Sequence, residues 1–278
     1  MAHPQIAVFA RLAKNGAKPV RKVEGQGSLL GRTMHGIAYD PIHDEFTVPQ
    51  QFGQAILTYR GGANGEEAPI RVIQGPHTQL DAPEHLEVDP VHNEIFVPTR
   101  DGAVLVFPRD GKGDVAPVRV LRGPDTMLAG DAPLAVDPVN NLLIVGGGAR
   151  GADGRRETRL LIFNRTDSGN AKPKSVIGGP QSRLYSFGGP FAVYPQKGEI
   201  LASVRGPGPY AELSSDEAYV GVWSIRDSGD VPPRWTIGGP HGVLRMPRGI
   251  ALDVKNKNML VSDKRLNAVL TFHFPEIF

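Results

Sequence analysis

The sequence predicts an all-β fold, a β-propeller built from four-stranded antiparallel blades with about 50 residues in each repeat. Three observations support this prediction. A short apolar strand with an aromatic anchor recurs along the chain, a proline-led strand follows most of its copies, and Asp-Pro turns join two further strands. One four-stranded blade cannot bury both of its faces, whereas repetition around an axis covers them. We therefore expect almost no helix.

The aromatic-anchored strand, called strand c below, is the clearest of the repeated segments. Its six copies carry the anchors Phe9, Tyr59, Phe107, Phe163, Trp223 and Phe272. The first five copies continue through an arginine and a glycine-containing turn into the proline-led strand d, as in 69–75 and 117–123. Because these arginines recur so regularly, we expect them to bind neighbouring turns rather than a single ligand; they are Arg11, Arg60, Arg109, Arg165 and Arg226.

The other two strands of the repeat form a hairpin. Strand a is the GIAYD-like segment and strand b is the EIFV-like segment that follows it. Between them lie Asp40-Pro41, Asp89-Pro90 and Asp137-Pro138, which suit a type I turn because aspartate favours its first position and proline its second. The short lengths and β-branched residues agree with strands. We count five a, five b, six c and five d strands.

This count predicts one propeller domain over residues 1–278, with five blades favoured and six blades, one of them degenerate, as the alternative. We expect the chain ends to close the fold, residues 5–25 pairing with residues 248–274 in one blade, because open sheet edges are unfavourable. The segments 5–11 and 268–274 then compete for one c position. The tail 274–278 holds three large apolar side chains, and we expect it to be packed.

Composition limits the classes of partner. Hydrophobic residues make up 40% and charged residues 22%, which excludes a disordered chain. A net charge of +2 does not suit nucleic-acid binding, and the lack of long apolar segments argues against a membrane partner. The absence of cysteine excludes disulfides and thiolate sites. No signal peptide is recognisable, so we expect a cytoplasmic protein or a mature secreted region without its leader.

Three segments resemble a known repeat: 36–48, 86–97 and 249–261, each with a GIAYD-like strand followed by an EIFV-like strand. They are similar to the NHL-type propeller repeat. The chain departs from that repeat in its greater length and in its fourth unit, where Tyr194-Pro195 replaces the Asp-Pro turn. The resemblance implies an architecture rather than one function, because such propellers serve as enzymes, ligand binders and docking surfaces.

The residues just before strand a predict where a ligand would bind. In antiparallel blades the d–a and b–c connections share one face, which normally holds the mouth of the central channel. Both long insertions, 146–158 and 205–218, fall in b–c connections, and loops often carry function. Aligning the repeats places Ala132 and Gly189, which have no ligand atoms, beside several polar residues. The candidate ligand-binding residues are His35, Glu84, His85, Asp131, Arg205, Arg248 and Asp263, with Gln50, Thr99 and Arg100 nearby.

We predict a non-catalytic module that binds a small molecule or a protein through this face. The alternative is a metal-dependent hydrolase or lyase, lactonase-like or glycosidase-like, with calcium or zinc held by His35, Glu84 and Asp263. A glycosidase would need two carboxylates, and Asp131 is a further candidate. These residues lack a ligand spacing such as HExxH. A third interpretation is a solvated channel in which Arg248 pairs with Glu84, and no other cofactor is expected.

Overall fold

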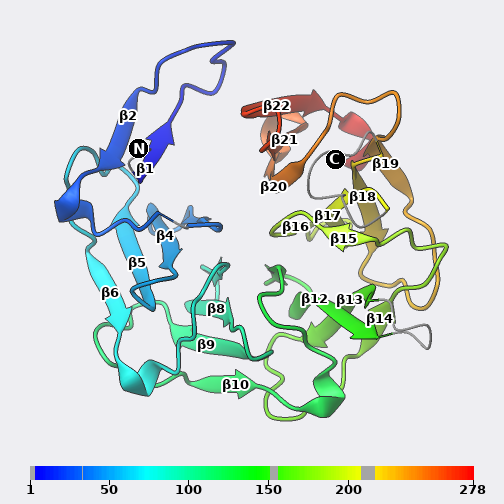
Figure 1. Ribbon diagram of the computed structural model, residues 1–278, viewed down its shortest axis with the longest axis horizontal. Coiled ribbons are helices and arrows are strands. Elements are labelled where there is room, and N and C mark those ends of the chain that lie inside the picture. The colour runs from blue at the N-terminus through cyan, green and yellow to red at the C-terminus, as the bar shows by residue number, and fades with distance from the viewer. Residues whose placement is uncertain (1–3, 33, 151–155, 208–216) are drawn as a thin grey trace. The chain divides into compact units, whose positions relative to one another are not determined.

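A computed structural model describes residues 4–32, 34–150, 156–207 and 217–278. The fold is an all-β propeller with five blades, as predicted (Figure 1). The chain forms two compact units, residues 1–100 with 104–119 and residues 101–103 with 120–278. Helix among the described residues is confined to five 3-10 turns of three residues each: η1 (Gln26–Ser28), η2 (Pro76–Thr78), η3 (Pro124–Thr126), η4 (Val254–Asn256) and η5 (Pro275–Ile277).

The first unit contains an N-terminal hairpin and the first two blades. The hairpin consists of β1 (Gln5–Val8) and β2 (Arg21–Glu24). Each blade is an antiparallel meander, and the outer strand of the second blade lies at the boundary between the units. The first blade holds β3 (Ala38–Asp40), β4 (Glu45–Gln50), β5 (Ala55–Arg60) and β6 (Arg71–Gln74). The second holds β7 (Glu87–Asp89), β8 (Glu94–Pro98), β9 (Val104–Pro108) and β10 (Arg119–Leu121).

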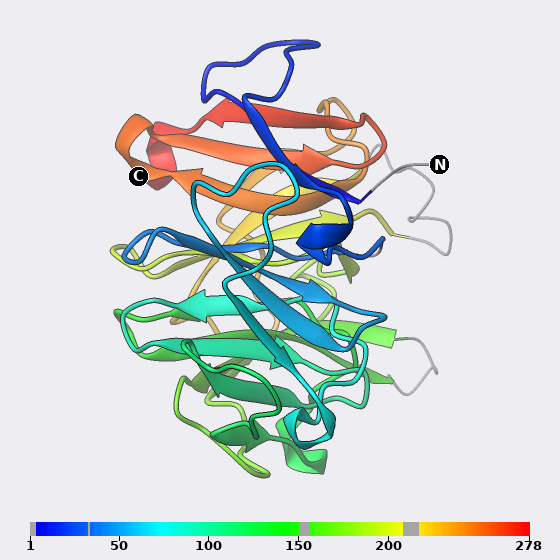
Figure 2. The same ribbon diagram turned by 90° about the vertical axis from the view of Figure 1, so that its left-hand side faces the viewer.

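The second unit contains the other three blades, and the antiparallel strands of the fifth blade, orange to red, can be followed in Figure 2. The third blade holds β11 (Leu134–Asp137), β12 (Leu142–Arg150), β13 (Arg156–Asn164) and β14 (Ser175–Ile177). The fourth holds β15 (Ser186–Phe187), β16 (Ala192–Tyr194), β17 (Glu199–Arg205), β18 (Tyr219–Ser224) and β19 (Trp235–Gly238). The fifth holds β20 (Pro247–Asp253), β21 (Asn258–Asp263) and β22 (Ala268–His273).

The strands at the two chain ends lie in different units, so the predicted pairing of residues 5–25 with residues 248–274 stays a prediction. Within the first unit, β1 and β2 pair with each other, and β2 also exchanges backbone hydrogen bonds with Gly65. Within the second unit, β20–β22 form a three-stranded sheet in which β22 fills the c position beside β21. The surplus c strand found in the sequence is therefore β1.

Two irregularities in the second unit were not foreseen. Most of the segment 146–158, predicted as a loop, continues the β12–β13 ladder from Gly146 opposite Leu160 as far as Arg150 opposite Arg156. In the fourth blade the inner strand is interrupted between β15 and β16, which both pair with β17. Gly188 lies in this interruption, where a Cβ atom would collide with the carbonyl oxygen of Pro247.

In the second unit the core lies between neighbouring blades. Between the third and fourth blades, Ile162 and Trp223 are fully buried. A second cluster joins the fourth and fifth blades and includes the C-terminal tail. Ile277 is fully buried there, and the Phe278 ring packs against Tyr194 with 5.4 Å between centroids. The predicted packing of the tail is confirmed.

Candidate functional site

The loops sort onto two faces as the strand order predicts. At one end of the first blade, Gln74 at the end of β6 donates from Nε2 to the Gly53 carbonyl in the b–c turn at 2.7 Å. At the other end of the second blade, Arg109 after β9 donates from Nε to Asn93 Oδ1 in the a–b turn at 2.9 Å. The b–c and d–a connections therefore share one face, and the a–b and c–d connections share the opposite one.

Three of the predicted site residues come together in the first unit. Glu84, just before β7, lies with its Oε2 atom 3.0 Å from Nδ1 of His35, just before β3. Its Oε1 atom accepts a hydrogen bond of 2.6 Å from Gln51 Nε2 in the turn between β4 and β5. The His85 ring lies 6.4 Å from the His35 ring between centroids. We call His35, Gln51, Glu84 and His85 the His35–Glu84 cluster.

The geometry of this cluster follows from close packing of two connections. A Cβ atom at Gly36 would lie 3.2 Å from the Cα of His85, so glycine lets the two chain segments approach. The His35 side chain is half exposed and the Glu84 side chain is mostly buried. An imidazole paired with a carboxylate and a carboxamide can bind a polar ligand through hydrogen bonds, because imidazole and carboxamide both donate and accept.

The candidates in the second unit have mainly structural contacts. Arg248, in β20, donates from Nη1 to the Gly188 carbonyl at 3.1 Å, while its own carbonyl accepts from Ser203 Oγ at 3.0 Å. Arg205 ends β17 opposite Ser186 and is largely buried. Asp131 lies just before β11 in the left-handed region, with φ of 55°.

Asp263 has a clear structural role that the sequence alignment missed. Its carboxylate is buried and accepts four backbone N–H groups, from Arg245 and Met246 on one oxygen and from Arg265 and Leu266 on the other, at 2.8–3.0 Å. A carboxylate with both oxygens engaged by the backbone is poorly suited to bind metal or to transfer a proton. The signal in the sequence was its place at a strand end before a turn, where aspartate caps backbone amides.

The part of the chain that the structure describes contains no group of three or more His, Asp or Glu residues able to hold a metal ion. No helix within the described ranges is long and apolar enough to cross a bilayer. Residues 208–216 of the second predicted insertion lie outside the described residues.

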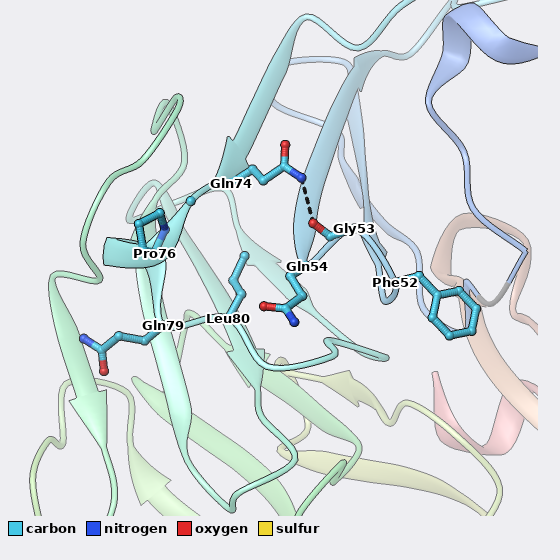
Figure 3. Close-up of a pocket in the computed structure, with 8 residues that line it drawn as sticks. Phe52, Gly53, Gln54, Gln74, Pro76, Gln79 and Leu80 are labelled. Atoms are coloured by element: carbon cyan, nitrogen blue, oxygen red, sulfur yellow. Dashed lines mark hydrogen bonds between the residues drawn. The ribbon is translucent and has the colours of Figure 1, made fainter.

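A cleft in the first blade escaped the sequence analysis (Figure 3). It has a volume of about 290 Å³ and lies between the b–c turn and the d–a connection of the first blade. The only sequence signal was the glutamine-rich turn QQFGQ at 50–54, which carried no recognised motif. The lining residues are Phe52, Gly53, Gln54, Gln74, Gly75, Pro76, Gln79 and Leu80.

Glu87 is a second residue that the sequence analysis did not single out. It occupies a position in strand a where the other four blades carry alanine: Ala38, Ala135, Ala192 and Ala251. Burial raises the pKa of its carboxyl group to about 7, and the nearby charge of Asp89 adds to this effect. A hydrogen bond from the Val88 N–H to Oε1 acts in the opposite direction. The signal that could have found Glu87 was the break in an otherwise uniform repeat position.

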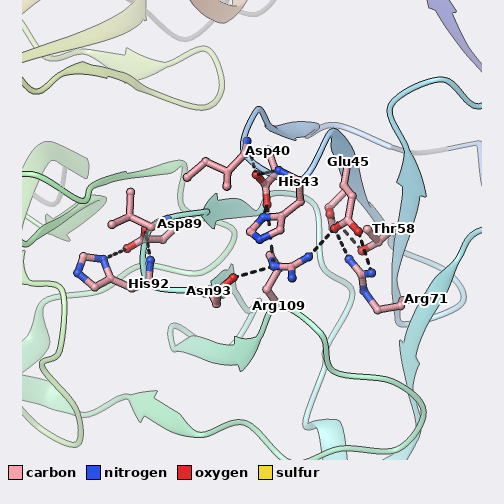
Figure 4. A network of polar contacts seen from close by, with 12 residues as sticks. Asp40, His43, Glu45, Thr58, Arg71, Asp89, His92, Asn93 and Arg109 are labelled. Carbon is pink, nitrogen blue, oxygen red and sulfur yellow. Dashed lines mark hydrogen bonds and ion pairs between the residues drawn. The ribbon is translucent and has the colours of Figure 1, made fainter.

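The opposite face of the first unit carries a network of ion pairs (Figure 4). Glu45 accepts hydrogen bonds from Arg71 of its own blade and, at 2.7 Å, from Arg109 of the second blade. Burial by itself raises the pKa of Glu45, but these two arginines outweigh it and lower the pKa below its usual value. Arg109 thereby joins Glu45 of the first blade to the Asn93 turn of the second blade. Two other regular arginines also bind side chains: Arg60 pairs with Glu67, and Arg165 donates to Asn141.

Comparisons with known proteins support the fold and no particular function. No family model matches the chain, and no curated protein matches its sequence. Similar solved structures include hydrazine synthase from Kuenenia stuttgartiensis, with a TM-score of 0.61 and 13% identity over 91% of this chain. A crystal structure of the mitotic checkpoint complex has a TM-score of 0.56 and 14% identity over 89% of this chain. The chain spans 67% and 63% of those two chains. At such low identity the similarity concerns the fold alone.

Proposed function

We propose that this protein is a non-catalytic binding module, whose b–c and d–a connections hold a small ligand or a protein partner. The propeller fold is compatible with binding or with catalysis. The observation that favours binding is the His35–Glu84 cluster, where one mostly buried carboxylate is held by a histidine and a glutamine from two other connections. Such a preorganised polar group, half open to solvent through His35, suits hydrogen bonding to a ligand.

The engagement of the carboxylates supports binding over catalysis. Both oxygens of Glu84 already have side-chain partners, and both oxygens of Asp263 have backbone partners. A general acid or base needs an oxygen within reach of the substrate proton. We also infer from the GIAYD-like hairpins that the blades are of the NHL type, although the comparisons support only the propeller architecture.

The alternative function is a propeller hydrolase or lyase that uses a divalent cation. The observation in its favour is that the His35 imidazole contacts Glu84 and the His85 ring lies 6.4 Å from the His35 ring, since imidazole and carboxylate are common ligands of zinc.

Calorimetric titration with calcium, zinc and a library of small metabolites would test the proposal. The variant Glu84→Gln removes the charge of the cluster, and Asp81→Asn removes an exposed carboxylate three residues earlier as a matched control. We expect a metabolite to bind the wild type and the control but not Glu84→Gln. Stoichiometric calcium or zinc in the purified protein, lost in Glu84→Gln together with a hydrolytic or eliminating activity, would instead support the enzyme.

A further inference from the structure

The tip of the b–c turn in the first blade presents an exposed aromatic ring. The Phe52 side chain is 76% exposed, the highest value among the large apolar side chains of the described residues. Its turn forms one wall of the cleft of about 290 Å³, and the connection from Gln74 to Leu80 forms the other. A ligand pocket usually measures about 300–1,000 Å³, so this cleft has room for a small group such as one sugar ring.

The lining of the cleft is polar but carries no charge. The only polar side chains that line it are three carboxamides, those of Gln54, Gln74 and Gln79. A carboxamide donates and accepts hydrogen bonds at once, and so does a hydroxyl group. An anionic or cationic ligand would find no opposite charge among the lining residues. The complementary ligand is therefore neutral and rich in hydroxyl groups.

The fold does not impose this neutral lining. In the second blade Asp101 stands at the position of Phe52, and Arg122 stands at the position of Gln74. There an ion pair of 3.1 Å joins Arg122 to Asp101. The backbone is nevertheless shared, because Gln79 and its equivalent Met127 have the same left-handed φ of 58°. The glutamines are therefore a property of the first blade alone and not of the repeat.

Hydrogen bonds hold the cleft walls in place without a ligand. Gln74 Nε2 binds the Gly53 carbonyl at 2.7 Å across the cleft, and the Gly53 N–H donates to the side chain of Gln50. Preorganised walls reduce the entropy that a ligand must lose on binding. Figure 3 shows Gln79 and Pro76 at one end, Gln54 between them and the hairpin tip, and the Phe52 ring projecting at the opposite end.

We propose that this cleft binds a neutral oligosaccharide. One sugar ring lies between the glutamines, and the Phe52 ring stacks on the apolar face of the next sugar. The proposal deepens the proposed function, because it names the ligand class for the same face of the molecule. Two contacts at opposite ends of the cleft imply that a disaccharide binds more tightly than its monosaccharide. Aromatic stacking on Phe52 accounts for roughly a two- to tenfold difference in affinity.

Residue-resolved NMR titration of the full chain tests this. The probes are cellobiose, maltose, lactose and N,N′-diacetylchitobiose, each with its monosaccharide, plus glucuronate as an anionic comparison. The variants are Phe52→Ala and Gln79→Asn, the latter chosen because asparagine tolerates the left-handed backbone. Leu266→Ala, at the Gly53 position of the fifth blade's b–c turn, is the matched control.

We expect at least one neutral disaccharide to shift the amides of 52–54 and 74–80, with roughly two- to tenfold weaker binding in Phe52→Ala and unchanged binding in Leu266→Ala. Equal binding by Phe52→Ala, or a preference for glucuronate, would overturn the proposal. If no saccharide shifts these amides while another ligand shifts those around His35 and Glu84, the saccharide proposal fails and the proposed function stands. If no ligand binds in either the calorimetric titration or the NMR titration, the saccharide proposal and the proposed function both fail.

Discussion

The two units share one turn geometry between strands a and b but stabilise it with different side chains. In the a–b turns of the first three blades an aspartate accepts two backbone N–H groups with one oxygen and a side-chain N–H with the other. The side chain is a histidine in the first unit, His43 and His92, where its Nδ1 atom lies 2.7 and 2.8 Å from the aspartate. It is an asparagine in the third blade, where Asn140 donates to Asp137 at 2.7 Å. In the fifth blade the Asn256 side chain donates to both oxygens of Asp253 at 2.8 Å, and the Asn256 backbone N–H donates to one of them at 3.2 Å.

The difference extends beyond the turns. Glu87 occupies a position in strand a where the second unit has only alanine. In the connection that follows β6, His77 pairs with Asp114 at 2.6 Å. At the matching position after β10, Asp125 donates its backbone N–H to Asn170. Imidazole and carboxyl groups change charge with pH, whereas carboxamides and alanine do not. One backbone geometry thus supports both units, but only the first has histidine after the Asp-Pro step of the a–b turn and a glutamate in the middle of strand a. We expect its stability to depend more strongly on pH.

Removing the shared aspartate should have the largest effect, and about the same effect in both units. Asp89 and Asp137 are fully buried, and each accepts two backbone N–H groups at 2.9–3.0 Å. Asp89→Ala and Asp137→Ala should each lower the free energy of unfolding by about 2–4 kcal/mol, because buried donors lose their partner. Urea denaturation at pH 8 measures this. If the free energy of unfolding falls by less than about 1 kcal/mol in either variant, the turn does not depend on hydrogen bonds to its aspartate.

Replacing Glu87 by alanine should stabilise the first unit. The folded-state pKa of Glu87 is raised to about 7, above its ordinary value of 4.5, so the folded state loses stability as pH rises between these values. Glu87→Ala should therefore gain roughly 1–3 kcal/mol at pH 8 and much less at pH 4.5. Glu87→Gln separates charge from size. Denaturation curves at both pH values measure the gain, and a gain independent of pH would contradict the raised pKa.

Arg109 tests whether the charged network of the first unit adds stability. Arg109→Ala removes hydrogen bonds to Glu45 and Asn93 and should cost about 1–2 kcal/mol at neutral pH. Because the pKa of Glu45 is lowered in the folded state, its ion pairs stabilise the fold at pH values above its ordinary pKa. This stabilisation is lost as the pH falls through the folded-state pKa. The cost should therefore shrink in acid. Denaturation curves at neutral and acid pH measure the cost, and a cost that does not change with pH would contradict the role of the Glu45 charge.

The smallest effect is expected from exchanging the capping side chains. His43→Asn gives the first blade the same capping side chain that the third blade has in Asn140. It should change the free energy of unfolding by less than about 0.5 kcal/mol at pH 8. Burial alone raises the pKa of Asp40, but hydrogen bonds from His43 and Ile42 outweigh it and lower the pKa. The resulting stability is lost as pH falls through the folded-state value. Because the variant lacks a side chain that can become positive, it should be less stable than wild type near pH 5. If wild type and His43→Asn have the same stability at every pH, the histidine cap does not make the first unit more sensitive to pH.

The strand inventory was largely predictable because it depends on local patterns. Every a, b, c and d strand counted in the sequence is present, and only β15 was added. Asp-Pro turns and aromatic anchors act within a few residues, so they remain readable one repeat at a time. The pairing of the chain ends was predicted from strand type alone. That pairing stays a prediction, because strand type does not decide between a local hairpin and a distant partner.

The candidate site was predictable only in part. Alignment of the repeats found His35 and Glu84, which lie 3.0 Å apart, from their shared position before strand a. The same alignment selected Asp263, which caps a turn, and it passed over Gln51 and Phe52. Repeat position places a residue near a face of the blade, but its hydrogen-bond partners come from other connections far away in sequence.

The sequence by itself determined the blade: four short strands, their order, their turns and the face on which each connection lies. These properties follow from backbone dihedral preferences and from apolar periodicity, which act over a few residues. Only the tertiary structure decided the chemistry. It determined that Glu84 meets both His35 and Gln51, that Glu87 is buried enough to hold its proton near pH 7, and that a glutamine-lined cleft lies beside Phe52. Burial, dielectric environment and hydrogen bonding arise where distant segments pack together, and a linear pattern carries no record of that packing.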